Sequence, residues 1–254
     1  MPLLPEDLSP LAAGLVIVAS FFTSALTAAL GIGGGLLLLA IMGAALPPMA
    51  VVPVHGVAQL ASNASRLAIL RAHVVWPAIG WFALGGLLGA TLGARLYVDL
   101  PAWALRIGVG AFVLAAAWGP KPASLRPGPR SFASVGAVGS FLSMFFGATG
   151  PIAAAMLAAT GWPRLNIVGS HAAAMTAQHG IKSLAFGAVG FAFWPWASVI
   201  AGIVVAGAGG SWVGSKILKR LPEAAFQRGL KLALTAAAVY LIARGLLDAA
   251  ARTD

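Results

Sequence analysis

The chain has 254 residues, of which 60% are hydrophobic and only 9% are charged. Because soluble domains carry about 25% charged residues, this composition excludes a water-soluble globular protein and predicts an integral membrane protein. The absence of cysteine excludes disulfides, thiolate metal sites and cysteine redox chemistry. The formal net charge of +10 comes mostly from the ends of hydrophobic segments, where basic residues set topology and contact anionic lipids. No nucleic-acid-binding motif accompanies this charge.

The first ten residues carry Glu6 and Asp7 in place of the basic region of a signal peptide. We therefore expect the first hydrophobic segment to be retained as structure. The short apolar alternation of an outer-membrane barrel is absent. The sequence thus predicts an all-α polytopic membrane protein.

Ten hydrophobic segments follow one another along the chain. They lie at 11–30, 33–46, 50–70, 76–96, 102–118, 131–146, 150–160, 166–186, 194–216 and 224–246. The second segment of each half is shorter than the ~20 residues that cross a bilayer as a helix. Each short segment either crosses or folds back as part of a re-entrant hairpin, and the sequence leaves both arrangements open.

One stretch of the chain occurs twice. Residues 31–66 and 147–182 align without a gap, and the repeat continues where GATLGARL at 89–96 matches GSWVGSKI at 210–217. The matched pairs of the first stretch are Gly31/Gly147, Gly34/Gly150, Pro47/Pro163, His55/His171 and Arg66/Lys182. Two homologous halves are the architecture of many secondary transporters.

The repeat sets the expected domain organisation. We predict an N-terminal tail at 1–10, a first transmembrane repeat at 11–119, a basic Pro-rich linker at 120–130, a second repeat at 131–247 and a C-terminal tail at 248–254. The two main basic clusters lie at 121–130 and 216–231. If each half makes an odd number of net crossings, these clusters share one side and the N-terminus is external. This predicts an inverted repeat. If the first two segments merge into one crossing, the clusters fall on opposite faces.

Glycine-containing breaks separate the first and second segments of each half. The breaks are Gly33-Gly34-Gly35 and Thr149-Gly150-Pro151, and each is typical of a helix N-terminus inside the hydrophobic region. Exposed N–H groups and the positive end of the helix dipole favour anions there. The alternative is close helix packing by small residues. We assign the glycines at 85, 89, 93, 210 and 214 to packing alone.

A polar stripe follows each break, on the third segment and on the eighth. Spacings of three and four place the members of a stripe on one helix face, and polar groups in membrane helices usually face a bundle interior or a cavity. Arg66 and Lys182, which end the stripes, would draw anions inward or else snorkel to the interface. The stripes comprise His55, Gln59, Ser62, Asn63 and Arg66 in the first half, and His171, Gln178, His179 and Lys182 in the second.

All six acidic residues lie at segment ends or in tails, so every ionisable candidate inside the membrane is basic. The substrate should therefore be an anion. No residues form a zinc motif, a Ser-His-Asp arrangement or a P-loop. We expect no cofactor, no metal site and no enzymatic activity.

With these residues the chain resembles the TauE/SafE family of sulfite exporters, whose halves each carry a Gly-rich turn, a Pro and a polar helix. The resemblance covers residues 11–246. It is carried in the first half by GIGGG at Gly31–Gly35, Leu46-Pro47-Pro48, His55, Gln59, Ser62, Asn63 and Arg66, and in the second by Gly147, Gly150-Pro151, Pro163, His171, His179 and Lys182. Many members have Thr-Ser near the start of the polar helix, where this chain has Val54-His55 and Ser170-His171.

The resemblance implies transport of small anions, notably sulfite and organosulfur anions, across the bacterial inner membrane. We therefore predict a secondary transporter working by alternating access, with the anion near the midplane between the two helix N-termini. The partners are a small anion and the lipid bilayer, with proton or ion coupling and oligomerisation left open. The alternatives are an anion channel and a non-transporting structural subunit of a membrane complex.

Overall fold

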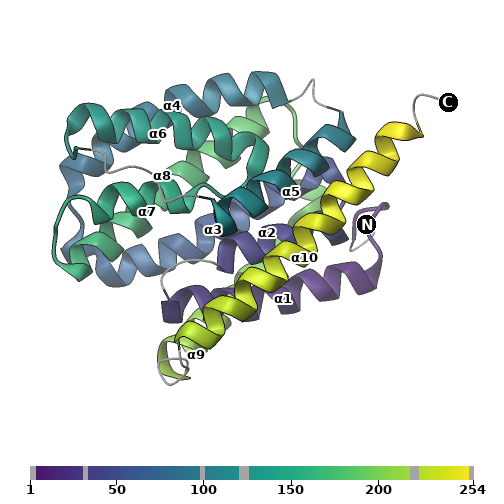
Figure 1. The fold of residues 1–254 in the computed structure, drawn as a ribbon, viewed down its shortest axis with the longest axis horizontal. Helices are drawn as coiled ribbons and strands as arrows, with labels where there is room; N and C mark the ends of the chain where they lie inside the picture. The colour runs from purple at the N-terminus through teal and green to yellow at the C-terminus, as the bar shows by residue number, and fades with distance from the viewer. Residues whose placement is uncertain (1–3, 31–33, 98–100, 120–125, 218–222, 252–254) are drawn as a thin grey trace. The chain divides into compact units, whose positions relative to one another are not determined.

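The computed structural model describes residues 4–30, 34–97, 101–119, 126–217 and 223–251. All regular structure in these ranges is helical (Figure 1). The α-helices are α1 (Pro10–Leu30), α2 (Gly34–Ala45), α3 (Pro48–Leu70), α4 (Trp76–Tyr97), α5 (Ala102–Trp118), α6 (Pro129–Phe146), α7 (Gly150–Ala158), α8 (Arg164–Ala188), α9 (Ala197–Ile217) and α10 (Glu223–Ala250), with 3₁₀ turns at Arg71–His73 and Trp194–Trp196. Each predicted hydrophobic segment forms a helix, so the all-helical fold class is confirmed.

Proline and glycine account for several of the helix boundaries. Pro48 and Pro129 begin α3 and α6, and Pro151 lies in the first turn of α7, where the missing N–H removes no helical hydrogen bond. Helix α6 ends at Gly147, whose φ of +79° is a backbone conformation that glycine adopts without strain. These residues place the break between α6 and α7 at Gly147–Thr149.

The helices differ in their ability to cross a membrane. Within the part of the chain that the structure describes, three stretches are long and apolar enough: Pro10–Ala28, Trp76–Tyr97 and Trp194–Gly214. By contrast, α2 has 12 residues and α7 has 9. At about 1.5 Å per residue, neither reaches across a hydrocarbon core of about 30 Å as a single straight helix.

The helices form two compact units, and each unit takes segments from both halves of the sequence. Unit 1 comprises Met1–Ala58, Leu100–Gly119 and Ala192–Asp254, and unit 2 comprises Gln59–Asp99 and Pro120–Phe191. Helix α3 is shared, because Ala58 ends the first stretch of unit 1 and Gln59 begins unit 2.

Unit 1 is built on two helix pairs, α1 with α9 and α5 with α10, and α2 packs on α1, α5 and α10. Glycines allow α1 and α9 to approach closely. A Cβ on Gly210 would overlap the carbonyl of Phe21, and a Cβ on Gly214 would overlap that of Ala25. The packing role predicted for these two glycines is confirmed.

Unit 2 is built on the pair α4 and α6, with α7 and α8 packed beside it. A Cβ on Gly85 or Gly89 of α4 would overlap the backbone of Ala133 or Ala137 on α6, and one on Gly93 would press on Met144. The predicted packing role is confirmed here too. Next to the glycine seam, as we call this contact between α4 and α6, lies an apolar core. It is formed by Val74, Ala78, Ile79, Phe82, Phe132, Val135, Ala153, Met156, Leu157, Ala173, Ala174 and Met175.

The same contact occurs once in each unit. Gly89 on Ala137 and Gly210 on Phe21 are equivalent pairs under the sequence repeat. In unit 2 the fourth helix of the first half contacts the first helix of the second half. In unit 1 these roles are exchanged.

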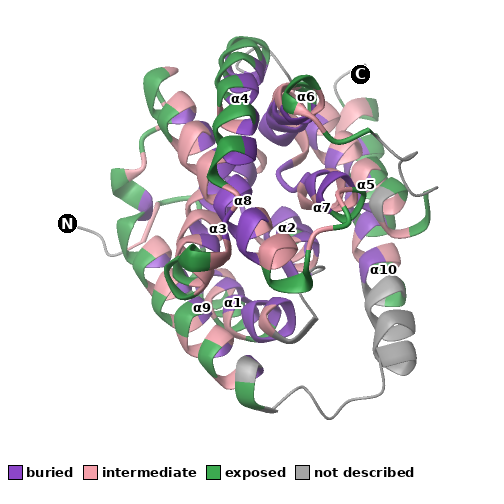
Figure 2. Cartoon of the chain, turned by 90° about the vertical axis from the view of Figure 1, so that its left-hand side faces the viewer, coloured by how far each residue is buried: buried purple, intermediate pink, exposed green. Residues whose placement is uncertain are grey.

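Large apolar side chains cover the outer faces of several helices. On α4, Leu84, Leu87, Leu88 and Leu92 are each more than half exposed, and Figure 2 shows exposed positions running along this helix opposite its buried face. Exposed leucines in such number are unsuited to water and match the hydrocarbon of a bilayer.

Candidate functional site

The break between α6 and α7 carries a chain of buried hydrogen bonds. Thr149, at the N-cap of α7, donates its hydroxyl to the carbonyl of Gly139 at 2.9 Å. Nε2 of Gln178, on α8, donates to the same hydroxyl at 2.7 Å. Thr149 and Gln178 are each 1% exposed. The start of α7 is therefore tied to both α6 and α8 by side chains predicted as site residues.

Lys182 lies one turn after Gln178 on α8 and is also 1% exposed. Its ammonium donates to the carbonyl of Gly147 at 2.9 Å, and the hydroxyl of Ser143 donates to the same oxygen at 3.3 Å. A helix C-terminus carries partial negative charge, so the end of α6 stabilises the cation. Lys182 is thus enclosed in protein rather than snorkelling to the membrane surface.

The two histidines at equivalent positions make equivalent contacts. Nε2 of His55 is 2.9 Å from the carbonyl of Gly35, and Nε2 of His171 is 3.2 Å from the carbonyl of Gly150. A carbonyl can only accept, so Nε2 carries the proton in both contacts. In each half, therefore, the polar helix holds the first turn of the short helix through one imidazole.

The remaining polar face of α3 lies in unit 2 and bonds within its own helix. Asn63 is 2% exposed and donates to the carbonyl of Gln59 at 2.7 Å. Arg66 donates to the side-chain oxygen of Asn63 at 2.6 Å. Gln59 and Ser62 are partly buried. Arg66, unlike its repeat partner Lys182, bonds to a side chain of its own helix.

The structure groups the predicted residues unevenly. Gly150, Thr149, Gln178 and Lys182 come together at the α6–α7 break. His179 is buried on α8 at 3% exposure. Gly33 lies outside the described residues.

Gly34 has a packing role, because a Cβ there would overlap Thr23 on α1. The alternative interpretation of the first break, close packing, therefore accounts for this glycine. The backbone of Gly35, in contrast, supplies the acceptor for His55.

Sequence reasoning missed the α6 side of this site. Gly139 and Gly147 contribute backbone carbonyls, which leave no signal in a list of side chains. Ser140 and Ser143, at 1% and 0% exposure, lie three residues apart in a hydrophobic segment, and that spacing was a usable signal.

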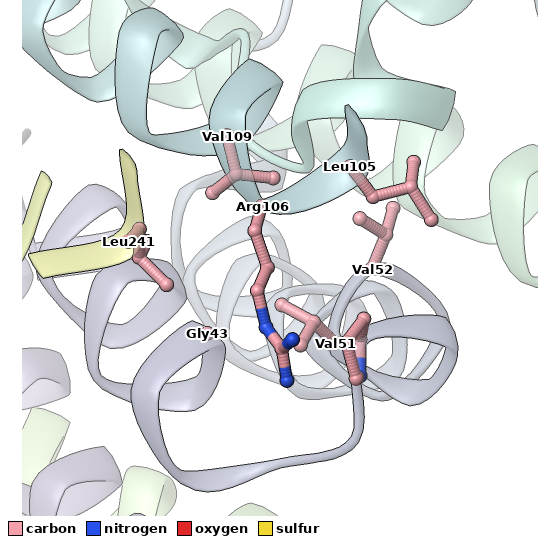
Figure 3. A pocket seen from close by; sticks show the side chains of 8 residues that line it. Gly43, Val51, Val52, Leu105, Arg106, Val109 and Leu241 are labelled. Atoms are coloured by element: carbon pink, nitrogen blue, oxygen red, sulfur yellow. The ribbon is translucent and has the colours of Figure 1, made fainter. Parts of the chain in front are cut away.

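A separate depression lies in unit 1, where the side chain of Arg106 extends between α2, α3 and α5 (Figure 3). Its walls are mainly apolar, and the guanidinium forms an ion pair with Asp248 of α10. None of the predicted site residues lines it. The lining residues are Gly43, Pro48, Val51, Val52, Leu105, Arg106, Val109 and Leu241.

Comparison with known proteins identifies a family. The family model described as sulfite exporter TauE/SafE matches residues 16–241. No curated protein and no solved structure matches the chain.

Proposed function

Because the chain belongs to the sulfite exporter TauE/SafE family, whose members are membrane transporters of sulfur-containing anions and not enzymes, we propose that it is a secondary transporter of sulfite or organosulfur anions. We further propose that the anion binds at the α6–α7 break, beside Lys182. The observation that carries this site is a buried ammonium whose described hydrogen bond goes to a neutral carbonyl.

The charge around Lys182 favours an anionic ligand. A buried cation is costly unless it is paired, and the one ion pair among the described residues joins Arg106 to Asp248 in unit 1. The carbonyl of Gly147 and the dipole of α6 offset only part of the charge. An anion that reached Lys182 would supply the missing partner.

The start of α7 adds to this preference. Its dipole and the N–H of Gly150 present partial positive charge, and Thr149 makes no side-chain cap there. Pro151 has no N–H, and Ile152 donates to the carbonyl of Thr149. Lys182 and the α7 N-terminus both belong to unit 2 and meet at the same break. A small oxyanion bound there would contact both a full and a partial positive charge.

The exchange of helices between units supports the two-repeat architecture. The Gly89–Ala137 and Gly210–Phe21 contacts and the paired histidine contacts follow the sequence repeat. We propose that the repeats have inverted topology, that the short helices α2 and α7 are re-entrant, and that alternating access comes from movement of one element of the structure against another. In a bacterial inner membrane the N-terminus would be external.

The test is uptake of radiolabelled sulfite into proteoliposomes that contain the purified chain. We expect saturable uptake that can proceed against a concentration gradient. Conduction without uphill accumulation would identify an anion channel. No anion flux from folded protein would leave the structural-subunit alternative.

The site is tested with Lys182→Met, which removes the charge. We expect uptake to fall by roughly ten- to a hundredfold, the loss typical of a charge-assisted hydrogen bond, and Lys182→Arg to retain part of it. A control variant outside the site should transport normally: Lys216→Met removes an exposed lysine that lies over Trp212. Normal uptake by Lys182→Met would contradict the proposed site.

A further inference from the structure

The orientation of the Gln178 amide is fixed by Thr149. The threonine hydroxyl has one proton and directs it to the carbonyl of Gly139. Gln178 must therefore donate to Thr149 through Nε2 at 2.7 Å, because the flipped amide would place two acceptors together with no proton between them. The side-chain oxygen Oε1 points away from this bond as an acceptor.

That oxygen has no donor among the described residues, although it is shielded from solvent. Gln178 itself is 1% exposed. A buried acceptor left without a donor destabilises the folded protein. Such a group in a binding site indicates that the ligand supplies the donor.

Space next to Oε1 is left by Gly139. A Cβ on this glycine would lie 3.6 Å from Oε1 and 3.8 Å from Oγ1 of Thr149, with no other contact within 4 Å. These are ordinary van der Waals distances, so an alanine would fit. It would also place a methyl group where a ligand approaches the oxygen.

The charge needed for the same ligand lies one helical turn away. Gln178 and Lys182 are four residues apart on α8 and therefore share a face, and both reach the α6–α7 break. The ammonium offers donors to an anionic oxygen, whereas Oε1 offers an acceptor. An anion that has only acceptor atoms would satisfy the first and be repelled by the second.

We propose that this site selects anions that carry a hydrogen-bond donor of their own, such as a protonated oxyanion or a hydroxylated sulfonate, and that Gln178 Oε1 accepts that donor. The inference rests on the proposed transport function. It defines which anions within the sulfur-containing class bind best. Lys182 binds the negative charge of the ligand, and Gln178 accepts the hydrogen bond from the donor group of the ligand.

The experiment compares ethanesulfonate with 2-hydroxyethanesulfonate, which have equal charge and differ by one hydroxyl. Each is titrated as an inhibitor of radiolabelled sulfite uptake into proteoliposomes. For the wild-type chain we expect the hydroxylated anion to inhibit at about tenfold lower concentration, as one satisfied hydrogen bond provides. In Gln178→Met the two anions should inhibit equally.

Two further variants separate recognition from folding. Gly139→Ala should fold and bind ethanesulfonate but lose the preference for the hydroxylated anion. Thr176→Val, which removes a hydroxyl whose described hydrogen bond goes to Ala172 of its own helix, should keep the preference.

Equal inhibition by both anions in the wild-type chain would overturn the inference and leave the transport function standing. An unchanged preference in Gln178→Met would overturn it as well. Absence of any sulfite uptake by folded wild-type protein would overturn the proposed function and this inference together.

Discussion

Lys182 and Arg66 occupy equivalent positions in the repeat, yet their surroundings differ. Lys182 is 1% exposed and reaches the C-terminus of a neighbouring helix at Gly147. Arg66 is partly buried and bonds to Asn63 on its own helix. The duplicated sequence has therefore diverged at the residues that carry charge, and the buried cation belongs to the second half.

Thr149 is the centre of the hydrogen-bond chain, so its hydroxyl should matter for stability. Replacing it with valine leaves the carbonyl of Gly139 and Nε2 of Gln178 without their partner. We expect Thr149→Val to lower the free energy of unfolding by about 1–3 kcal/mol, measured as a lower thermal midpoint of the detergent-solubilised protein. Thr149→Ser keeps the hydroxyl and should stay close to wild type. Equal midpoints for the valine and serine variants would show that these bonds contribute nothing.

Much of this site could be predicted from side chains, and the rest could not for a physical reason. Gln178 and Lys182 were predicted because polar residues are rare and costly in apolar helices, and Thr149 was predicted because it lies at the break before a helix N-terminus. Their main acceptors on α6 are backbone carbonyls, at Gly139 and Gly147. Every residue has a carbonyl, so only the bend at Gly147 and the packing of α6 reveal which ones are used.

The helices themselves were predictable because hydrophobic runs and Pro or Gly boundaries set their ends. Helix α5, for example, was expected at 102–118 and spans Ala102–Trp118. Helix partners were not predictable, because a Gly-rich face fits any neighbour with small residues or an exposed backbone groove. Nothing in the run containing Gly89 indicates that its partner is Ala137.

The glycine seam between α4 and α6 should be intolerant of even a methyl group. At Gly89 an added Cβ overlaps the backbone of Ala137, whereas at Gly80 of the same helix nothing lies within 4 Å. We expect Gly89→Ala to destabilise the protein by about 1–3 kcal/mol through overpacking. Gly80→Ala should stabilise it by about 0.5–1 kcal/mol through helix propensity.

Thermal unfolding of the two variants in detergent checks this contrast. The contact between α1 and α9 in unit 1 allows the same comparison to be made with two adjacent glycines of α9. Gly210→Ala should destabilise because it meets the backbone of Phe21, and Gly209→Ala should not, because its Cβ would lie 3.7 Å from the ring of Phe21. Similar midpoints for Gly89→Ala and Gly80→Ala would contradict the close packing of α4 on α6.

The distribution of the chain between two units distinguishes this molecule from a pair of tandem domains. Each unit contains helices from both halves, and α3 belongs to both. The membership of a family of membrane transporters over residues 16–241 agrees with the apolar outer faces of helices such as α4. The proposed orientation of the protein in the membrane rests on charge alone.

The absence of cysteine makes that orientation directly measurable, because the wild-type chain cannot react with maleimides. Glu6 and Arg126 are both exposed and lie on the segments predicted to face opposite sides. We expect Glu6→Cys to react with a membrane-impermeant maleimide on intact cells. Arg126→Cys should react only after the membrane is permeabilised. Labelling of both positions from outside would contradict the predicted topology.

The contact between Phe21 and Gly210 connects one of the first helices to leave the ribosome with one of the last. During synthesis α1 enters the bilayer long before α9 exists. Until then the face of α1 that later contacts the glycines of α9 must lie against lipid or a chaperone. Unit 1 can close only when translation is nearly complete. A chain truncated after the first half therefore leaves α1 without α9 and α4 without α6. The unpaired faces of these helices are a feature by which quality control can recognise an incomplete chain.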